Sequence, residues 1–115
     1  MNVAVVGYRK YNNYEQFELT LKAIIDTEND VIISGGAKGT DAMAEKFANE
    51  NNLNKIIHKA EWKKYGLIAG TIRNILIIRD CDYLVAFVSK FSKGTYDAIN
   101  KAKNNNKQVI IINID

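Results

Sequence analysis

Proline is absent from this chain of 115 residues, and cysteine and histidine occur only once each. The single cysteine, Cys81, excludes an internal disulfide, and with His58 as the only histidine a Cys/His zinc site is excluded too. No apolar run approaches the roughly 18 residues that cross a bilayer. The first residues lack a basic lead and a cleavage site, so they predict a strand and not a signal peptide. We therefore expect a cytoplasmic protein with no metal site, no required cofactor and no membrane partner.

The composition is that of an ordinary globular protein, but its charges are unevenly distributed. With 47% hydrophobic and 25% charged residues, the chain is expected to form one domain over residues 1–115. The net charge is +3, yet most of the charged residues between 15 and 50 are acids. Residues 55–79 are basic, with Glu61 as their only acid. Such a basic stretch either suits a phosphate-bearing partner or is a solvated face.

Short apolar runs alternate with helical patterns along the whole chain. Strands are predicted at Val3–Val6, Val31–Ile33, Lys55–His58, Tyr83–Val88 and Val109–Ile112. Helices are predicted at Tyr14–Asp26, Thr40–Asn51, Leu67–Ile78 and Thr95–Lys103, with residues 59–66 as a loop. Continuous apolar strands separated by helices predict an α/β fold. We expect a single Rossmann-like, doubly wound domain whose five-stranded, mainly parallel sheet has helices on both faces.

Ligands of such sheets bind at the carboxyl ends of the strands, so the loops that follow the strands are the candidate site. The most distinctive of them runs from Ser34 through Gly35 and Gly36 to Thr40 and Asp41, between a strand and a helix. Unpartnered N–H groups at a helix start favour an anion. The glycines match neither G-x-x-x-x-G-K-[ST] nor G-x-G-x-x-G. This segment is therefore either an anion cradle or only a tight connection.

Other candidates follow the remaining strands. Arg9, after Gly7 and Tyr8, either contacts a phosphate or lies on the surface. Lys93, Gly94 and Thr95 open the last helix and form a second candidate cradle, or a plain helix start. Three further interpretations stay open. Asp41 caps its helix, anchors a ribose or pairs with Arg73, and Trp62 and Tyr65 either stack on a base or cover the sheet edge. Arg73, beside Asn74, either pairs with an acid or, as we favour, contacts the ligand.

In combination, these motifs resemble a known family. Gly7-Tyr8-Arg9, the stretch Ser34–Asp41, the spaced residues from Ala60 to Asn74, and Gly94-Thr95 occur in the order found in small SLOG-type Rossmann-like proteins of bacteria and phages. The resemblance covers nearly the whole chain. It implies a nucleotide or nucleotide-derived ligand, held by the Gly-Gly turn and the Gly-Thr helix start, in a bacterial or phage-infected cytosol.

The wider superfamily includes the cytokinin-activating phosphoribohydrolases and the DNA-processing protein that loads recombinase on single strands. The phosphoribohydrolase signature is an Arg upstream of Pro-Gly-Gly-x-Gly-Thr-x-x-Glu, and Arg73 matches that Arg. The position of the catalytic Glu is Ala98 here, and the two leading glycines are missing. Asp97 precedes Ala98 and points about a hundred degrees away around the helix. This departure argues against N-glycosidic hydrolysis.

Three functions are compatible with these residues. The first is a binder of an NAD or ADP-ribose derivative or a cyclic nucleotide, acting as a sensor or as a phage sponge for an immune signal. The second is a nucleoside 5′-monophosphate hydrolase that uses Arg73 with Asp97 or Asp41. The third is single-stranded nucleic-acid binding, and we rank them in this order. We also expect a homodimer or larger homo-oligomer. The expected ligand-binding residues are Gly7, Tyr8, Arg9, Ser34, Gly35, Gly36, Lys38, Thr40, Asp41, Trp62, Tyr65, Arg73, Asn74, Lys93, Gly94 and Thr95.

Overall fold

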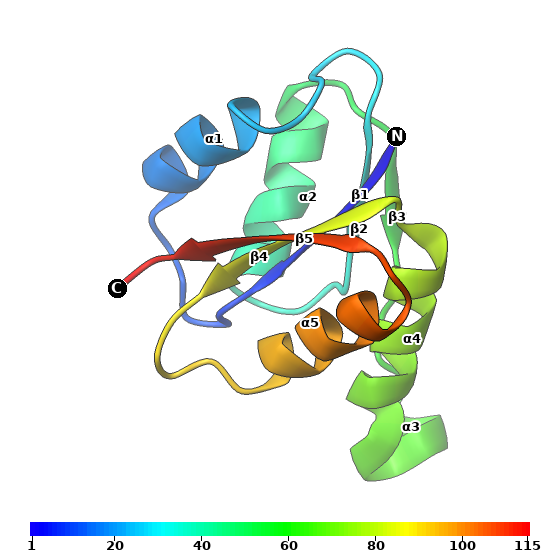
Figure 1. Cartoon of the computed structure of the whole chain (residues 1–115). Coiled ribbons are helices and arrows are strands. Elements are labelled where there is room, and N and C mark those ends of the chain that lie inside the picture. Colours follow the sequence, from blue (N-terminus) through cyan, green and yellow to red (C-terminus); the bar gives the residue numbers. More distant parts are fainter.

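A computed structural model describes all residues from Met1 to Asp115, and a parallel five-stranded sheet runs through its middle (Figure 1). Its strands are β1 (Asn2–Gly7), β2 (Val31–Ser34), β3 (Lys55–Ile57), β4 (Tyr83–Val88) and β5 (Gln108–Asn113). They lie in the order β3-β2-β1-β4-β5, and every pair is parallel. The chain moves outward from β1 to β3 and then crosses back to β4. The switch in strand order therefore falls between β1 and β4.

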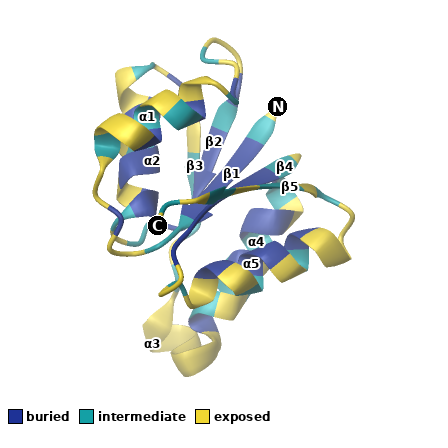
Figure 2. Cartoon of the chain, turned by 60° about the vertical axis from the view of Figure 1, so that its left-hand side comes forward, coloured by how far each residue is buried: buried dark blue, intermediate teal, exposed yellow.

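Helices cover both faces of the sheet, which confirms the predicted doubly wound α/β fold (Figure 2). The first face carries α1 (Tyr14–Lys22) and α2 (Thr40–Glu50), and the second carries α4 (Ala69–Asp80) and α5 (Gly94–Asn104). The core under α1 and α2 contains the buried rings of Phe17, Phe47 and Phe87. The core under α4 and α5 is mainly aliphatic. No helix of this structure is long and apolar enough to cross a membrane.

The first helix is shorter than the sequence predicted. The Asn13 side chain accepts a hydrogen bond from the Gln16 N–H and caps its start, but the helix ends at Lys22 and not at Asp26. Beyond it, the Asp26 carboxylate accepts the Glu28 N–H at 2.9 Å, and the Asp30 carboxylate accepts the Asp26 N–H at 2.8 Å. Side chains that bond to nearby backbone compete with helix formation, so this apolar segment turns instead of continuing.

The segment from 59 to 66, predicted as a loop, contains a short helix. This helix, α3, spans Trp62–Tyr65, and a 3-10 turn, η1 (Gly66–Ile68), follows it. The N–H groups of Lys64 and Tyr65 both bond to the Glu61 carbonyl. A four-residue helix is too short to show an apolar period, which is why the pattern missed it. The next helix, α4, begins at Ala69, two residues later than predicted.

Candidate functional site

A pocket of about 770 Å³ lies at the carboxyl ends of β1 and β4, where the strand order switches. Four parts of the chain line it. They are the end of β1 with the residues after it (6–10), Ala37 and Asp41 around the start of α2, three residues of α4 (Arg73, Asn74 and Ile77), and residues 90–95 together with Ala98 of α5. In Figure 1 the end of β1, the loop after β4 and the first turn of α5 lie together. The topology therefore brings these separate segments to one site.

The pocket lining is strongly cationic. It contains Arg9, Lys10, Arg73, Lys90 and Lys93, and Asp41 is its only acid. Burial raises the pKa of Asp41, and the hydrogen bond from the Ala37 N–H and the charge of Arg73 offset part of that rise. Cations gathered in a concave site with low-dielectric walls concentrate anions there. The lining therefore favours a ligand with negative charge.

The first turn of α5 adds backbone donors to this pocket. The helix starts at Gly94 and has no side-chain hydrogen bond at its cap, so its first N–H groups keep no side-chain partner. A Cβ atom at Gly94 would meet no atom within 4 Å, which means that the space before the helix is open. Lys93 and Thr95 flank that glycine and line the pocket. The partial positive charge of a helix start reinforces the charge of the lysine.

The glycine-rich turn (Ser34–Asp41) uses many of its backbone donors inside the protein. The N–H groups of Gly36, Ala37 and Thr40 donate to the Ser34 hydroxyl, the Asp41 carboxylate and the Tyr8 carbonyl, at 3.4, 3.1 and 3.3 Å. Gly39 has φ +68°, and a Cβ there would collide with the Arg9 backbone. The turn thus packs against the segment after β1. Apart from Ala37 and Asp41, its residues lie outside the pocket lining, namely Ser34, Gly35, Gly36, Lys38, Gly39 and Thr40.

Arg73 connects this turn to the pocket. Its Nη1 group donates to the Gly35 carbonyl oxygen at 2.9 Å, and its Nε group donates to the Asn74 side-chain oxygen at 2.9 Å. No carboxylate lies within ion-pair distance of Arg73. Burial lowers the pKa of Arg73, and Asp41 partly offsets this effect. The Nη2 group has no hydrogen-bond partner in the protein and remains available to a ligand.

Asp97 lies outside the pocket lining, and its carboxylate is held by two hydrogen bonds. Its carboxylate accepts from Asn74 Nδ2 at 2.9 Å and from Lys101 Nζ at 2.6 Å. Burial alone would raise the pKa of Asp97, but these two bonds outweigh it, so the pKa lies below its usual value. Ala98, at the position of the phosphoribohydrolase glutamate, does line the pocket. The side chain at this position is a methyl group and not a carboxyl.

Several residues predicted from the sequence lie elsewhere. Trp62 and Tyr65 are on α3, beyond the start of α4, and do not line the pocket. Tyr8 lines the pocket, but part of its ring packs against the aromatic core. His58 also lies outside the lining, and its Nε2 atom bonds to the Asp80 carboxylate at 2.7 Å. Of the predicted set, the lining therefore contains Gly7, Tyr8, Arg9, Asp41, Arg73, Asn74, Lys93, Gly94 and Thr95.

Sequence reasoning missed part of the lining, most importantly Lys10, Lys90 and Phe91. Lys10 directly follows the predicted Arg9. Phe91 stands between two polar residues in a strand-end loop, and a large apolar residue in that position was an available signal. None of the three is a residue type that the motifs name at its position, so none was singled out.

The fold and pocket together define a Rossmann-like α/β domain with a basic ligand pocket at the carboxyl edge of its sheet. Comparison with known proteins gives the family. Residues 1–65 match the YspA, cpYpsA-related SLOG family, and the chain belongs to that family. This confirms the SLOG resemblance found in the sequence. The matched region includes the segment after β1 and the glycine-rich turn, but it ends before Arg73 and the start of α5.

One relative and two solved structures are similar to this chain. The gene 61 protein of Mycobacterium phage D29 is 33% identical over 79 residues, which cover 64% of this chain and 63% of that protein. DNA processing protein A from Streptococcus pneumoniae has a TM-score of 0.79 at 21% identity, covering 96% of this chain and 49% of the other. DNA processing protein A from Helicobacter pylori has a TM-score of 0.75 at 20% identity, with 96% and 64% coverage. This chain thus matches less than two thirds of the length of each.

Proposed function

We propose that the pocket binds a nucleotide or a nucleotide-derived small molecule and holds it by its phosphate. The observation that carries this proposal is that five cationic residues and the uncapped start of α5 line one pocket, with a single acid among them. A phosphate there would contact Lys93, Thr95 and the first N–H groups of the helix. Arg9 and Arg73 would neutralise further negative charge. Membership of the SLOG family supports the same class of ligand.

Within this class, the ligands that we propose are an NAD or ADP-ribose derivative or a cyclic nucleotide, bound without a required cofactor. The protein would act as a sensor, or as a phage-type sponge that sequesters an immune signal. Holding a signal needs no general acid, and Asp97 is hydrogen-bonded outside the pocket while Ala98 faces it. The relative in a phage supports action in the cytosol of an infected cell.

Two measurements test this function, namely the mass of any ligand that the purified protein retains and the affinity of variants that lack one positive charge. Native mass spectrometry of protein taken directly from cells should show the mass of a bound nucleotide. Lys93→Gln should weaken binding of AMP or ADP-ribose about ten-fold, because a lost phosphate contact is worth roughly 1–2 kcal/mol. Lys103→Gln changes the net charge equally at the other end of α5 and should leave affinity unchanged. Absence of any retained nucleotide, with no binding by titration calorimetry, would contradict the proposal.

The alternative is a nucleoside 5′-monophosphate phosphoribohydrolase. One observation favours it, because the pKa of Asp41 is raised by burial and this carboxyl lines the pocket beside Arg73. A carboxyl with a raised pKa can act as a general acid. Chromatography after incubation with AMP would detect released base. Turnover that disappears in Asp41→Asn or Asp97→Asn would replace the binding function with this one.

Binding of single-stranded nucleic acid ranks third. The Helicobacter pylori structure is described by its single-stranded DNA binding mode, and the fold of this chain is similar. Such binding usually needs a basic groove with a series of stacking aromatics. Here Trp62 and Tyr65 lie on α3, outside the pocket that contains Phe91. A gel shift titrated with salt that shows retardation of single-stranded DNA would raise the rank of this function.

We also propose that the protein forms a homodimer or a larger homo-oligomer. Five of its ten exposed large apolar side chains lie between the start of α3 and the middle of α4, and the members of this apolar cluster are Trp62, Tyr65, Leu67, Ile68 and Ile75. Figure 2 shows α3 exposed and projecting beyond the layer formed by α4 and α5. Exposed apolar clusters of this kind favour burial against another surface, and we take a second copy of the chain as that surface.

A further inference from the structure

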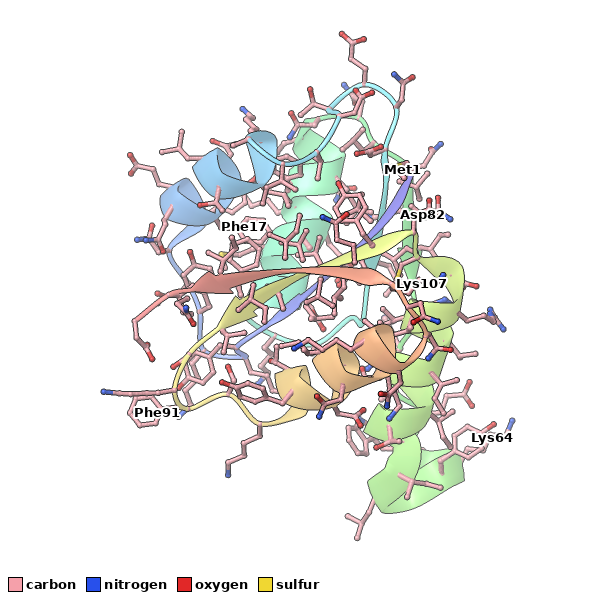
Figure 3. All side chains as sticks on the ribbon, in the orientation of Figure 1. Met1, Phe17, Lys64, Asp82, Phe91 and Lys107 are labelled. Carbon is pink, nitrogen blue, oxygen red and sulfur yellow. The ribbon has the colours of Figure 1, made fainter.

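Phe91 is an exposed aromatic side chain in the lining of the basic pocket. Its residue is 63% exposed, and it lies at the outer edge of the segment between β4 and α5 (Figure 3). The other aromatic residue of the lining, Tyr8, has part of its ring packed against the core. Phe91 belongs to neither core cluster. Phe91 is therefore the exposed aromatic residue of the lining, and no core packing has to change before a ligand reaches its ring.

The backbone that carries Phe91 is held by a network of hydrogen bonds. The Phe91 N–H donates to the Ser89 hydroxyl at 3.1 Å, and the Ser92 N–H donates to the Ser89 carbonyl at 3.0 Å. The Ser92 hydroxyl in turn accepts the Ser89 N–H at 3.0 Å. The Asp115 carboxylate accepts from the Ser89 hydroxyl and from the Lys90 N–H. These bonds hold the backbone on both sides of an exposed ring, so little ordering is left for ligand binding to do.

The surroundings of Phe91 place positive charge next to an aromatic ring. The Lys90 ammonium lies 5.3 Å from the centroid of the Phe91 ring, which places a cation over this aromatic ring. Gly94 and the start of α5 follow three residues later, a separation of at most about 10 Å along an extended chain. A nucleotide carries its base and its 5′-phosphate on the two sides of one ribose. It therefore needs a stacking surface and an anion site that lie near each other, as Phe91 and the start of α5 do along the chain.

We propose that Phe91 is the stacking residue for the planar base of the bound ligand, with the phosphate at Lys93 and the first turn of α5. This inference rests on the proposed function and extends it to the base. It assigns the stacking role to a residue other than Trp62 and Tyr65, which are outside the lining. Stacking of a base on an aromatic side chain tolerates different bases, so Phe91 favours nucleotides over bare sugar phosphates and is not selective for one base.

Two ligands that share a phosphate and differ in the base test this assignment. AMP and ribose 5-phosphate are titrated against the wild-type protein, Phe91→Leu, Phe91→Trp and Tyr96→Leu by calorimetry. Phe91→Leu keeps an apolar side chain but loses the ring, and we expect AMP to bind about ten-fold more weakly while ribose 5-phosphate binds unchanged. Phe91→Trp should restore AMP binding. Tyr96 is 47% exposed and outside the lining, so Tyr96→Leu is the matched control.

The outcomes separate this inference from the proposed function. If the wild-type protein binds neither ligand, the proposed function fails and the base assignment fails with it. If it binds AMP and Phe91→Leu binds AMP equally well, the function stands and Phe91 is not the stacking residue. An equal loss for both ligands would show that Phe91 only supports the loop, which also overturns the assignment.

Discussion

Asp41 is the residue whose position is least expected for an anion pocket. Its carboxyl is 8% exposed, lines the pocket and carries the only negative charge there. The same carboxyl accepts the Ala37 N–H at 3.1 Å and so fixes the end of the glycine-rich turn. An ionised group in this place repels a phosphate, but its loss would leave a backbone donor unpaired. An ionised Asp41 would therefore weaken phosphate binding, while its hydrogen bond stabilises the local conformation of the turn.

Asp41→Asn separates these two effects. The asparagine side-chain oxygen can still accept the Ala37 N–H, while the negative charge is gone. We expect AMP to bind several-fold more tightly, a gain of about 1 kcal/mol. Because burial raises the pKa of Asp41, the wild-type carboxyl is neutral below that raised pKa and ionised above it. The AMP affinity of the wild type, relative to that of the variant, should therefore rise as the pH falls through that pKa. Calorimetry measures both proteins at each pH, because ionisation of the AMP phosphate changes both affinities equally and leaves their ratio unaffected. A constant ratio would contradict this.

Gly39 provides a second prediction at this scale, for stability. Its φ of +68° is unfavourable for any residue with a Cβ, and a Cβ there would strike the backbone of Arg9. Gly39→Ala should lower the free energy of unfolding by about 1–3 kcal/mol or more, measured by urea denaturation. Gly70→Ala is the control, because Gly70 is inside α4 and a Cβ would meet Trp62 at an ordinary 3.5 Å. That variant should be slightly more stable than the wild type.

Among the elements, the segment between β4 and α5 contributes most to the pocket. Lys90, Phe91 and Lys93 come from it, and Asp115, far along the sequence, accepts hydrogen bonds from its first residues. The segment has little regular structure of its own, so its conformation depends on these bonds. Its contribution to binding is therefore a property of the connection and not of the sheet.

Asp115→Ala should release this segment without unfolding the protein. The change removes the acceptor of the Lys90 N–H and of the Ser89 hydroxyl. We expect faster hydrogen exchange at the Lys90 amide, a few-fold loss of AMP affinity and a shift of only a few degrees in Tm. Asp82→Ala is a matched control, since Asp82 accepts the Asn2 N–H at 2.6 Å near the opposite end of the sheet (Figure 3). It should leave AMP affinity unchanged, and equal losses in both variants would refute the link.

Regular elements were predictable because their patterns are local, and the details of the pocket were not. The strands at Val31 and Tyr83 and the helix at Thr40 follow from apolar periods and strand–helix junctions in the sequence. The short α3 has no period to detect. The glycine-rich turn was recognised as a junction, but its donors bond to the Tyr8 carbonyl and to the Asp41 carboxylate. That use of its N–H groups depends on how distant loops pack, which no local pattern encodes.

At the scale of the molecule, the strand order determines where a ligand can bind. The order of the parallel strands switches between β1 and β4, and the loops after these two strands separate there. The pocket lies at this point, with α2 on one face and α4 and α5 on the other. The alternation of strands and helices in the sequence predicted a site in the loops that follow the strands, and the pocket lies there. It did not show that α3 and η1 extend past the sheet with most of the exposed apolar cluster, because exposure depends on what packs against a helix.

The apolar cluster leads to a prediction about the assembly of the whole protein. Leu67 is 98% exposed, and its neighbours Ile68 and Trp62 are 59% and 51% exposed. If a second copy covers these side chains, sedimentation equilibrium should show a concentration-dependent dimer or larger oligomer. Leu67→Glu should shift this equilibrium to the monomer, because the interface would bury a carboxylate without a partner. Leu19 on α1 is 66% exposed but outside the cluster, so Leu19→Glu should leave the assembly unchanged. A wild-type protein that stays monomeric at all concentrations, or an equal effect of both substitutions, would show that this cluster does not join two copies.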